Sequence, residues 1–419
     1  MASSPVIFAL TAALVVSASI SIGFYAVVQR KRALALCLAL CTLGLGFSAS
    51  AQNPIIITFD APGAGTIPGQ VPLPQGTFPY GINDTGAIGG NFQDVNNVLH
   101  GFFRAPDGAI VAFDAPGAGT GAFQGTQGFV INSEGAIAGK TIDANFAQHG
   151  MVRARDGTIT TFDAPGASMG PYQGTFAVNI NREGVIAGSY VDASNVFHVF
   201  LRAPDGAIAT FDVPGAGTGS FQGTYVCAVD CLNSNGAIVG GFTDASNVNH
   251  GFLRTPEGAI TTFDALGAGA GAGQGTFGGG INPAGIIVGS YLDANNVNHG
   301  FLLSRNLAFT TFDVPGAGTG PFQGTLVSTA TINSEGEITG NYLDANNVSH
   351  GFLRARHGAI TTFDVPAAGT TSGLGTTPVD NNAANAITGW YADASGLYHG
   401  FVRTGRRCRE DRHENCQED

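Results

Sequence analysis

The residues best suited to chemistry recur in a fixed pattern, an aspartate followed six residues later by a histidine. Such pairs can bind a metal ion or transfer a proton. The histidines are 49, 49, 52, 49, 51 and 49 residues apart. Self-similarity at a period near fifty residues indicates a repeat architecture. The seven pairs are Asp94/His100, Asp143/His149, Asp192/His198, Asp244/His250, Asp293/His299, Asp344/His350 and Asp393/His399.

Seven equivalent copies favour a structural role for this pattern, because a catalytic site is normally singular. We expect each aspartate to cap a turn, with its carboxylate accepting hydrogen bonds from backbone amides. The histidine then packs at the start of the next strand. A metal or acid–base site in every repeat, or a ring of seven ligand sites, is the functional alternative. The sequence predicts no catalytic residue, no metal site and no cofactor.

A second pattern is a long loop that reads Pro-Gly-Ala-Gly-Thr-Gly-x-Phe-Gln-Gly-Thr in its fullest form. It places an aromatic ring beside an amide, and such pairs can stack on a sugar and hydrogen-bond to it. No lysine or predicted helix follows, which argues against a phosphate-binding loop. A plain spacer between strands is the structural alternative. The candidate ligand-binding residues are Phe123, Gln124, Tyr172, Gln173, Phe221, Gln222, Phe322 and Gln323.

One repeat, from Thr175 to Gly215, shows the elements that must position these residues. Its extended runs are Phe176–Asn181, Val185–Val191, Phe197–Arg202 and Ala207–Asp212, separated by Gly, Pro, Asn and Asp clusters. This spacing predicts an antiparallel meander of four strands. The strands are apolar on both faces, as in sheets stacked radially around an axis.

The ends of the repeat block, residues 55–404, predict how it closes. The block opens with Ile55–Asp60, which matches a fourth strand, and ends at His399–Arg403, which matches a third strand. The expected fold is all-β: a seven-bladed β-propeller with four-stranded antiparallel blades. Its ring would be closed by the N-terminal strand completing the last blade, which leaves no blade edge unpaired.

The His-Gly-Phe that follows an Ile-Asn-x-x-Gly-x-Ile-x-Gly stretch resembles the HAF-type extracellular repeat of bacterial secreted proteins. The middle residue here is glycine rather than alanine. The resemblance covers about 350 residues and implies export and a repeat array, without a settled activity. WD-repeat propellers similarly use an aspartate and a histidine within each blade as internal fasteners.

The N-terminal region, residues 1–51, has the parts of a secretory signal. Arg30-Lys31-Arg32 precedes the apolar stretch Ala33–Phe47, and the small residues of Ser48–Ala51 follow. We expect cleavage after Ala51 and an extracellular, periplasmic or cell-envelope location. The earlier apolar stretch Val6–Val28 is either an over-extended start of translation or a retained membrane anchor. Residues 405–419 form a charged tail that we expect to be flexible.

Four cysteines follow the predicted signal, an even number that suits an oxidising compartment. Cys227 and Cys231 lie where the fourth repeat carries three extra residues, and a bulged loop there could join them. Cys408 and Cys416 are the second disulfide candidate. Cys408, His413 and Cys416 could instead bind zinc, although their spacing is unfamiliar.

The net charge of −12 and the lack of a basic patch in the repeats argue against nucleic acid as a partner. We expect a secreted, monomeric and non-catalytic binding or scaffold module for a carbohydrate, a glycoconjugate or an extracellular protein. One alternative is a secreted polysaccharide hydrolase or lyase, and another is a structural surface protein without a discrete ligand. An enzyme should show an asymmetric repeat. The departures Val199, Leu266, Glu337 and Trp390 form no triad or carboxylate pair in the sequence.

Overall fold

The computed structural model describes residues 54–69, 74–227, 229–327 and 331–404. The chain divides into two units, Met1–Gln52 and Asn53–Asp419, and every described residue belongs to the second. The predicted signal region and the C-terminal tail therefore lie outside the described residues. The described ranges form 28 β-strands and contain no helix.

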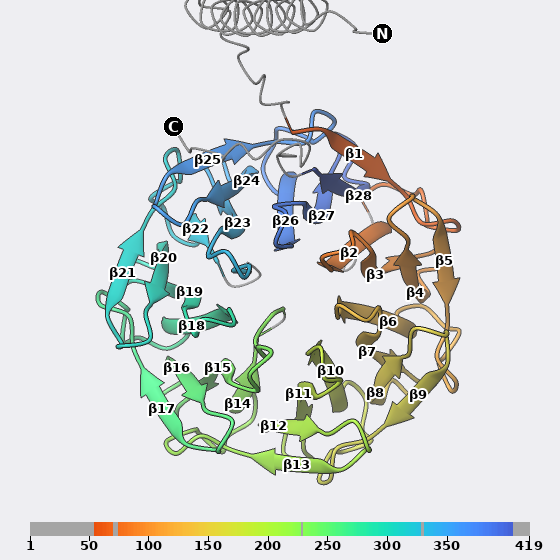
Figure 1. Ribbon diagram of the computed structural model, residues 1–419, viewed down its shortest axis with the longest axis horizontal. Helices are drawn as coiled ribbons and strands as arrows, with labels where there is room; N and C mark the ends of the chain where they lie inside the picture. Colours follow the sequence, from red (N-terminus) through yellow and green to blue (C-terminus); the bar gives the residue numbers. More distant parts are fainter. Residues whose placement is uncertain (1–53, 70–73, 228, 328–330, 405–419) are drawn as a thin grey trace, which may run out of the picture. The chain divides into compact units, whose positions relative to one another are not determined.

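The strands form seven repeating groups of four around a central axis (Figure 1). We call each group a unit and number the units from one, which comprises β2 to β5, to seven, which comprises β26 to β28 and β1. The innermost strands are β2 (Gly76–Ile82), β6 (Gly125–Ile131), β10 (Gly174–Ile180), β14 (Gly223–Val226), β18 (Gly275–Ile281), β22 (Gly324–Leu326) and β26 (Gly375–Asn381).

Two further strands follow in each unit, and both pair antiparallel with their neighbours. The second strands are β3 (Ile88–Gln93), β7 (Ile137–Ile142), β11 (Ile186–Val191), β15 (Ile238–Thr243), β19 (Ile287–Leu292), β23 (Ile338–Leu343) and β27 (Ile387–Ala392). The third strands are β4 (Leu99–Arg104), β8 (Gln148–Arg153), β12 (Phe197–Arg202), β16 (Asn249–Arg254), β20 (Asn298–Leu303), β24 (Ser349–Arg354) and β28 (Tyr398–Arg403).

The outermost strands are short and form the rim of the ring (Figure 1). In each of them the middle two residues are exposed, which fits a strand with one free edge. They are β1 (Ile56–Phe59), β5 (Ile110–Phe113), β9 (Ile159–Phe162), β13 (Ile208–Phe211), β17 (Ile260–Phe263), β21 (Phe309–Phe312) and β25 (Ile360–Phe363).

The core lies between neighbouring units and repeats around the ring. A phenylalanine of the third strand is fully buried in six of the units, and in the second unit Met151 takes its place. Phe102 meets Phe59, on the outermost strand of the preceding unit, edge to face with ring centroids 6.2 Å apart. Arg104 then covers Phe59, with its guanidinium carbon 4.8 Å from the ring centroid. Aromatic contacts between units thus stabilise the ring.

The two ends of the repeat block meet in the predicted way. Strand β1 pairs antiparallel with β28, and Thr58 lies opposite Phe401. The first strand of the chain therefore supplies the fourth strand of the seventh unit, beside residues that lie more than three hundred positions later.

The predicted closure of the ring is wrong, because the units are not separate sheets. A parallel bridge joins the third strand of every unit to the innermost strand of the next, as Leu99 joins Gly125. All 28 strands therefore form one sheet. The first three strands of each unit, 21 in all, form a closed ring of paired strands. The seven outermost strands, β1 among them, pair only with the outside of this ring. The bridge between Gly76 and Tyr398 closes this ring, and β1 does not.

A glycine at the start of each innermost strand explains why the sheet is continuous. Gly76 has φ of 129°, and a Cβ atom there would overlap the carbonyl oxygen of Tyr398. Only glycine allows such close approach in this conformation. The seven-bladed propeller of independent blades, closed by its N-terminal strand, is thus corrected to a closed all-β ring of 21 strands with seven added outer strands.

Candidate functional site

Two faces of the ring carry the candidate residues. The loops that lead into the innermost strands lie beside the aspartate turns, because Phe123 N donates to Asn97 O at 2.7 Å. We call this surface the loop face. The innermost strands run from it to the opposite surface, the turn face, where the turns that begin at Asn83 and its six equivalents are found.

Each aspartate of the Asp-x5-His pattern caps the turn between the second and third strands. Asp94 Oδ1 accepts hydrogen bonds from Asn96 N at 2.9 Å and from Val98 N at 2.7 Å. Asp143, Asp192, Asp244, Asp293, Asp344 and Asp393 accept the equivalent pair. In Asp244 the bond from Val248 N is the largest of the effects that lower the carboxyl pKa. These carboxylates act as turn caps.

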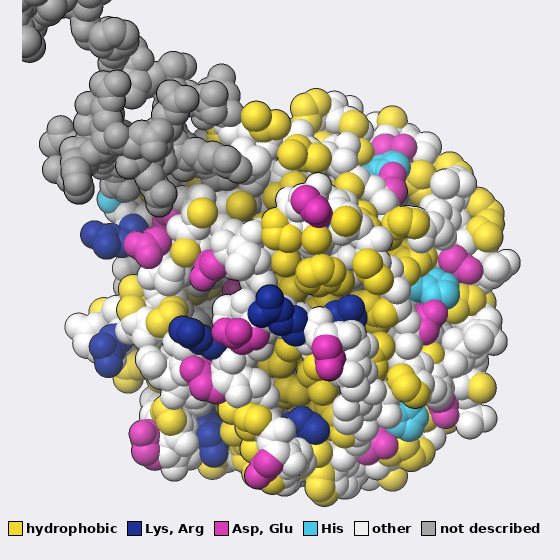
Figure 2. Space-filling view, turned by 45° about the vertical axis from the view of Figure 1, so that its right-hand side comes forward, with side chains coloured by type: hydrophobic (Ala, Val, Ile, Leu, Met, Phe, Trp, Pro, Cys, Tyr) yellow, Lys and Arg dark blue, Asp and Glu magenta, His cyan; other side chains and the backbone are white. Residues whose placement is uncertain are grey.

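Each histidine lies between that aspartate and a second one, at the end of an outermost strand. His100 Nδ1 is 2.9 Å from Asp114, and His100 Nε2 is 3.8 Å from Asp94. The histidine ring stacks on Phe92, with centroids 5.0 Å apart. Figure 2 shows histidines of this kind at the edge of the ring, each beside acidic side chains. The histidines therefore fasten the third strand to the turn and to the outermost strand.

The other six histidines of the pattern repeat these contacts. Their Nδ1 atoms lie 2.9 to 3.0 Å from the second aspartate, and their Nε2 atoms lie 3.6 to 3.9 Å from the aspartate of the pattern. Five of them also stack on a tyrosine or phenylalanine of the second strand, and the sixth lies opposite a threonine instead. They are His149, His198, His250, His299, His350 and His399.

Each histidine lies closer to the aspartate of the outermost strand than to the aspartate six residues earlier. This holds for His100, His149, His198, His250, His299, His350 and His399. The strand register explains the difference. Gly101 lies opposite Phe113, which places His100 opposite Asp114, while the turn amides occupy Asp94 Oδ1.

The second aspartates are structural partners of the histidines that the sequence reasoning missed. They are Asp60, Asp114, Asp163, Asp212, Asp264, Asp313 and Asp364. A recurring Phe-Asp pair was the available signal, 14 residues after each of the first six histidines. Within the described ranges, no group of three or more His, Cys, Asp or Glu side chains could hold a metal ion.

The glutamines of the aromatic-amide pairs are bonded inside the loop face. Gln222 Oε1 accepts from Gly219 N at 2.9 Å, and its Nε2 donates to Asn247 Oδ1 at 3.0 Å. Gln124 and Gln323 accept from the equivalent glycine amides, and the Nε2 atoms of Gln124, Gln173 and Gln323 donate to the neighbouring aspartate turns. Both ends of the Gln124, Gln222 and Gln323 amides position the loop, and Gln173 is bonded there through its Nε2.

Three of the four aromatic partners point the other way, into solvent. Phe221 is 74 % exposed, Tyr172 and Phe322 are each 63 % exposed, and Phe123 is half-buried. All four have a left-handed backbone, with φ between 63° and 65°. This conformation is uncommon for residues other than glycine and is a genuine outlier for bulky ones.

Glycine occupies the same position in two other units. Gly273 and Gly373 have φ of 80° and 81°, and a Cβ atom at either would meet no atom within 4 Å. Gly273 N donates to Asn247 O at 2.7 Å, as Phe221 N donates to Asn195 O at 2.8 Å. The turn thus forms equally well with glycine, and the exposed rings are not required by the fold.

The turn face has a cavity of about 220 Å³ on the axis, which we call the axial cavity. Its wall is a ring of seven asparagines that the sequence reasoning mentioned only as turn residues. Asn83 shows their bonding: its Nδ2 donates to the carbonyl oxygen of the equivalent asparagine in the next unit, and its Oδ1 caps its own turn. The asparagine ring consists of Asn83, Asn132, Asn181, Asn233, Asn282, Asn333 and Asn382.

The asparagine ring is interrupted at one place, between the third and fourth units. Six inter-unit bonds are present, at 3.0 to 3.4 Å. The seventh, from Asn181 to Asn233, is not made. Asn181 is only 7 % exposed, and its Oδ1 accepts from Val185 N at 2.9 Å. Among the described residues, its Nδ2 has no hydrogen-bond partner.

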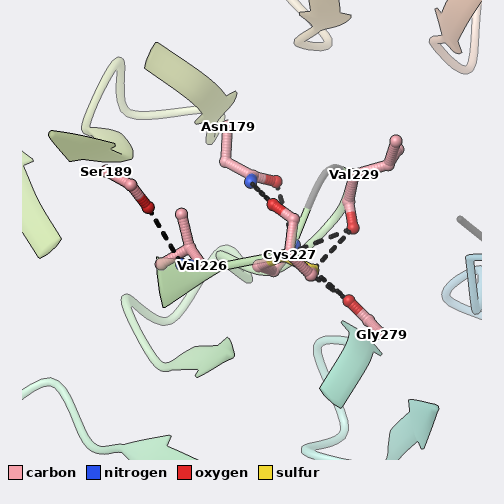
Figure 3. The surroundings of a disulfide bond; sticks show 7 residues. Asn179, Ser189, Val226, Cys227, Val229 and Gly279 are labelled. Atoms are coloured by element: carbon pink, nitrogen blue, oxygen red, sulfur yellow. Dashed lines mark hydrogen bonds between the residues drawn. A yellow bond between two sulfur atoms is a disulfide. The ribbon is translucent and has the colours of Figure 1, made fainter. Parts of the chain in front are cut away.

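The gap coincides with the three extra residues of the fourth unit. Cys227 and Cys231 form a disulfide across this insertion, with Cα atoms 5.7 Å apart. Asn179 holds both ends of the loop, since its Nδ2 donates to Cys227 O at 3.3 Å and its Oδ1 accepts from Cys231 N at 2.9 Å (Figure 3). The other candidates, Cys408 and Cys416, lie outside the described residues.

The insertion brings Asp230 to Asp380, on the innermost strand of the seventh unit. Both line the axial cavity, and their carboxyl groups hydrogen-bond to each other. Burial raises the pKa of Asp380 to about 6, although Ile82 N also donates to it at 2.7 Å. Burial and the neighbouring charge of Asp380 raise the pKa of Asp230. The sequence reasoning missed this carboxyl pair, since 150 positions separate its members.

Carboxyl groups in contact do not suit glycoside hydrolysis. The two carboxyl groups of a retaining glycosidase are about 5 Å apart, and those of an inverting enzyme are further apart. The other asymmetric residues are placed elsewhere: Val199 is buried in the core, Leu266 is exposed, and Glu337 Oε2 accepts from Asn333 Nδ2 at 3.3 Å. Trp390 packs on Tyr80 and Phe78, with ring centroids 5.2 and 5.8 Å away.

Comparison with models of protein families and with curated protein sequences finds no match. Solved structures give distant likenesses. Puromycin hydrolase aligns with 80 % of this chain at 12 % identity and a TM-score of 0.45, and the chain spans 55 % of its length. An Aleuria aurantia lectin in complex with Fucα1-6GlcNAc aligns with 67 % of this chain and 96 % of its own, at 11 % identity and a TM-score of 0.37.

A neuraminidase-like protein of subtype N11, from A/flat-faced bat/Peru/033/2010, covers 85 % of this chain and 99 % of its own, at 10 % identity and a TM-score of 0.33. The Aleuria aurantia lectin is described as a six-bladed β-propeller with a fucose recognition mode, whereas this chain has seven units. These likenesses are too distant to transfer a ligand or an activity. The search for a membrane-spanning helix among the described residues finds none.

Proposed function

We propose that this protein is an exported, multivalent carbohydrate-binding module whose loop face presents Phe123, Tyr172, Phe221 and Phe322 to sugars. The observation that carries the proposal is the left-handed backbone of exposed aromatic residues at a position where glycine also serves. Backbone strain of this kind costs about 1–3 kcal/mol per residue and clusters at functional sites. A role in ligand binding explains why four units carry an aromatic ring there.

The surroundings of each ring suit a sugar. The backbone amide of Phe322 donates to Asn296 O at 2.6 Å, so the ring adjoins the turn of the preceding unit that contains the exposed Asn295. Phe221 adjoins the turn that contains the exposed Ser194 in the same way. An aromatic face beside amide and hydroxyl groups can stack on the apolar side of a sugar and bond to its hydroxyls.

The arrangement favours binding to repeated or branched glycans. The four aromatic residues lie in the loops that precede four different innermost strands of one ring. Their positions are therefore fixed relative to one another. Tyr172 also packs on Phe146 at a tilt, with ring centroids 5.3 Å apart, which widens the aromatic surface there. Several weak sites on one rigid body raise the overall affinity for a multivalent ligand well above that of one site.

The predicted signal region and the resemblance to HAF-type repeats support export, which would place the loop face in contact with extracellular or envelope glycans. N-terminal sequencing of the protein recovered outside the cytoplasm tests this part, and a chain that begins before Ala33 would contradict cleavage of the signal. The binding proposal is tested by a glycan array probed with protein purified from cells that express the full chain. Saturable binding supports it, and no binding to any glycan favours a purely structural role.

A further inference from the structure

The axial cavity is separate from the loop face and has its own chemistry. It lies at the turn face and its volume is about 220 Å³. Pockets for drug-sized ligands are roughly 300–1,000 Å³, so a ligand here is smaller. The axial cavity can hold a molecule of the size of a monosaccharide or an amino acid.

The charged groups that line the axial cavity are mainly acidic. Asp84, Asp230 and Asp380 contribute three carboxyl groups. Asp84 accepts a hydrogen bond from Ala383 N at 3.0 Å. Arg182 is the one basic residue among the described lining residues; its side chain is 73 % exposed, 3.7 Å from Glu134. The interior therefore favours a cation over an anion.

Asn181 offers a donor to a ligand in the axial cavity. Asn181 lines the same cavity, is more than nine-tenths buried, and has no partner for its Nδ2 among the described residues. The equivalent amides of the other six asparagines each donate to a neighbouring unit. Because the side chain lines the axial cavity, its amide can donate to a ligand oxygen there.

We propose that the axial cavity binds a small organic ammonium compound that also carries hydroxyl oxygens, of the size of a hexosamine. The ammonium group binds between the carboxyl groups of Asp230 and Asp380, which both line the axial cavity. A ligand oxygen accepts from Asn181 Nδ2. Since the described residues hold no cluster of three metal-binding side chains, an organic cation suits the site better than a metal ion.

Isothermal titration calorimetry of the purified protein with glucosamine tests this proposal, with glucose and N-acetylglucosamine as neutral controls of the same shape. We expect saturable binding of glucosamine alone. Asp380→Asn removes a charged partner and should weaken binding roughly 10- to 100-fold, and Asn181→Ala should weaken it roughly 3- to 10-fold. Asp230→Asn gives a second test of the carboxyl pair if Asp380→Asn does not fold.

The matched control is Phe221→Gly combined with Phe322→Gly, which alters only the loop face and should leave glucosamine binding unchanged. This control separates the present proposal from the proposed function, because each can fail alone. Equal binding of glucose and glucosamine, or glucosamine binding that survives both aspartate variants, would overturn the proposal. Saturable calcium binding at Asp380 without glucosamine binding would replace it with a metal site.

Discussion

His399 and Asp60 lie 339 positions apart in the chain, and His399 Nδ1 is 3.0 Å from both carboxylate oxygens of Asp60. The other six histidines make this contact with an aspartate 14 residues later in the same unit. The junction between the two ends of the block is thus fastened by the same side-chain contact as the interior of each unit. The hydrogen bond with Asp60 raises the pKa of His399.

We expect Asp60→Asn to lower the pKa of His399, because the substitution removes the carboxylate that stabilises the imidazolium. A raised folded-state pKa contributes stability that is fully present below the unfolded pKa and is lost as the pH rises through the folded pKa. The stability difference between the wild type and Asp60→Asn should therefore shrink above neutral pH. NMR titration of the histidines measures the pKa, with the other six as internal references. An unchanged His399 pKa would contradict the assignment.

Phe221→Gly should not reduce the stability of the fold. The substitution removes about 1–3 kcal/mol of backbone strain and exposes no core, while glycine costs about 0.5–1 kcal/mol in entropy. Urea unfolding should give a free energy of unfolding equal to or above that of the wild type. A loss of more than about 2 kcal/mol would mean that the ring packs structurally, which weakens its assignment to ligand binding.

The asparagine ring predicts two unequal substitutions. Asn132→Ala removes the inter-unit bond to Asn181 O and turn bonds from Ala136 N and Glu134 N. Asn181→Ala removes the turn bond from Val185 N and no inter-unit bond. We expect Asn132→Ala to lower the free energy of unfolding by roughly 1–3 kcal/mol more than Asn181→Ala. Equal losses in urea unfolding would argue against the ring as a stabilising feature.

The contribution of Asp380 to the stability of the fold should depend on pH in the opposite sense to that of an aspartate in an ion pair. Burial raises the pKa of Asp380 from 3.8 to about 6, so the folded state binds this proton more tightly than the unfolded state. The stability that the protonated Asp380 contributes is present below about pH 4 and is lost as the pH rises to about 6. Asp380→Asn stays neutral and still accepts a bond from Ile82 N.

Relative to the wild type, Asp380→Asn should gain roughly 2 kcal/mol of stability between pH 4 and pH 7. Thermal unfolding of both proteins across this range measures the difference. A constant difference at all pH values would show that the carboxyl group of Asp380 titrates normally in the folded state.

Local structure could be predicted from the sequence because its causes are local. The turn-capping position of Asp94 depends on amides two and four residues away, and Asn385 replaces glycine with φ of 57° because asparagine tolerates this conformation. The pairing of β1 with β28 followed from a strand that matched a missing fourth. These features need only the period of the repeat and the chemistry of single turns.

Features that depend on contacts between units could not be predicted in this way. The continuous sheet results from the close approach of Gly76 to Tyr398, which the repeat pattern alone does not reveal. The pairing of Asp230 with Asp380 requires the insertion to reach the axis and the seventh unit to lie opposite it. The bonding of Gln222 to Asn247 depends on how a loop packs on a neighbouring turn. Each of these contacts joins residues that are far apart in the sequence and meet only in the folded structure.

Glycan-array binding by three proteins tests the central claim most directly: the wild type, Phe221→Gly with Phe322→Gly, and Gly273→Phe. Gly273 has the loop conformation of Phe221 and open space around it, so its variant adds a ring where the fold tolerates one. We predict that the wild type binds a glycan saturably, that the double glycine variant binds it at least tenfold more weakly while remaining folded, and that Gly273→Phe binds at least as tightly as the wild type. Undiminished binding by the folded double glycine variant would contradict the account.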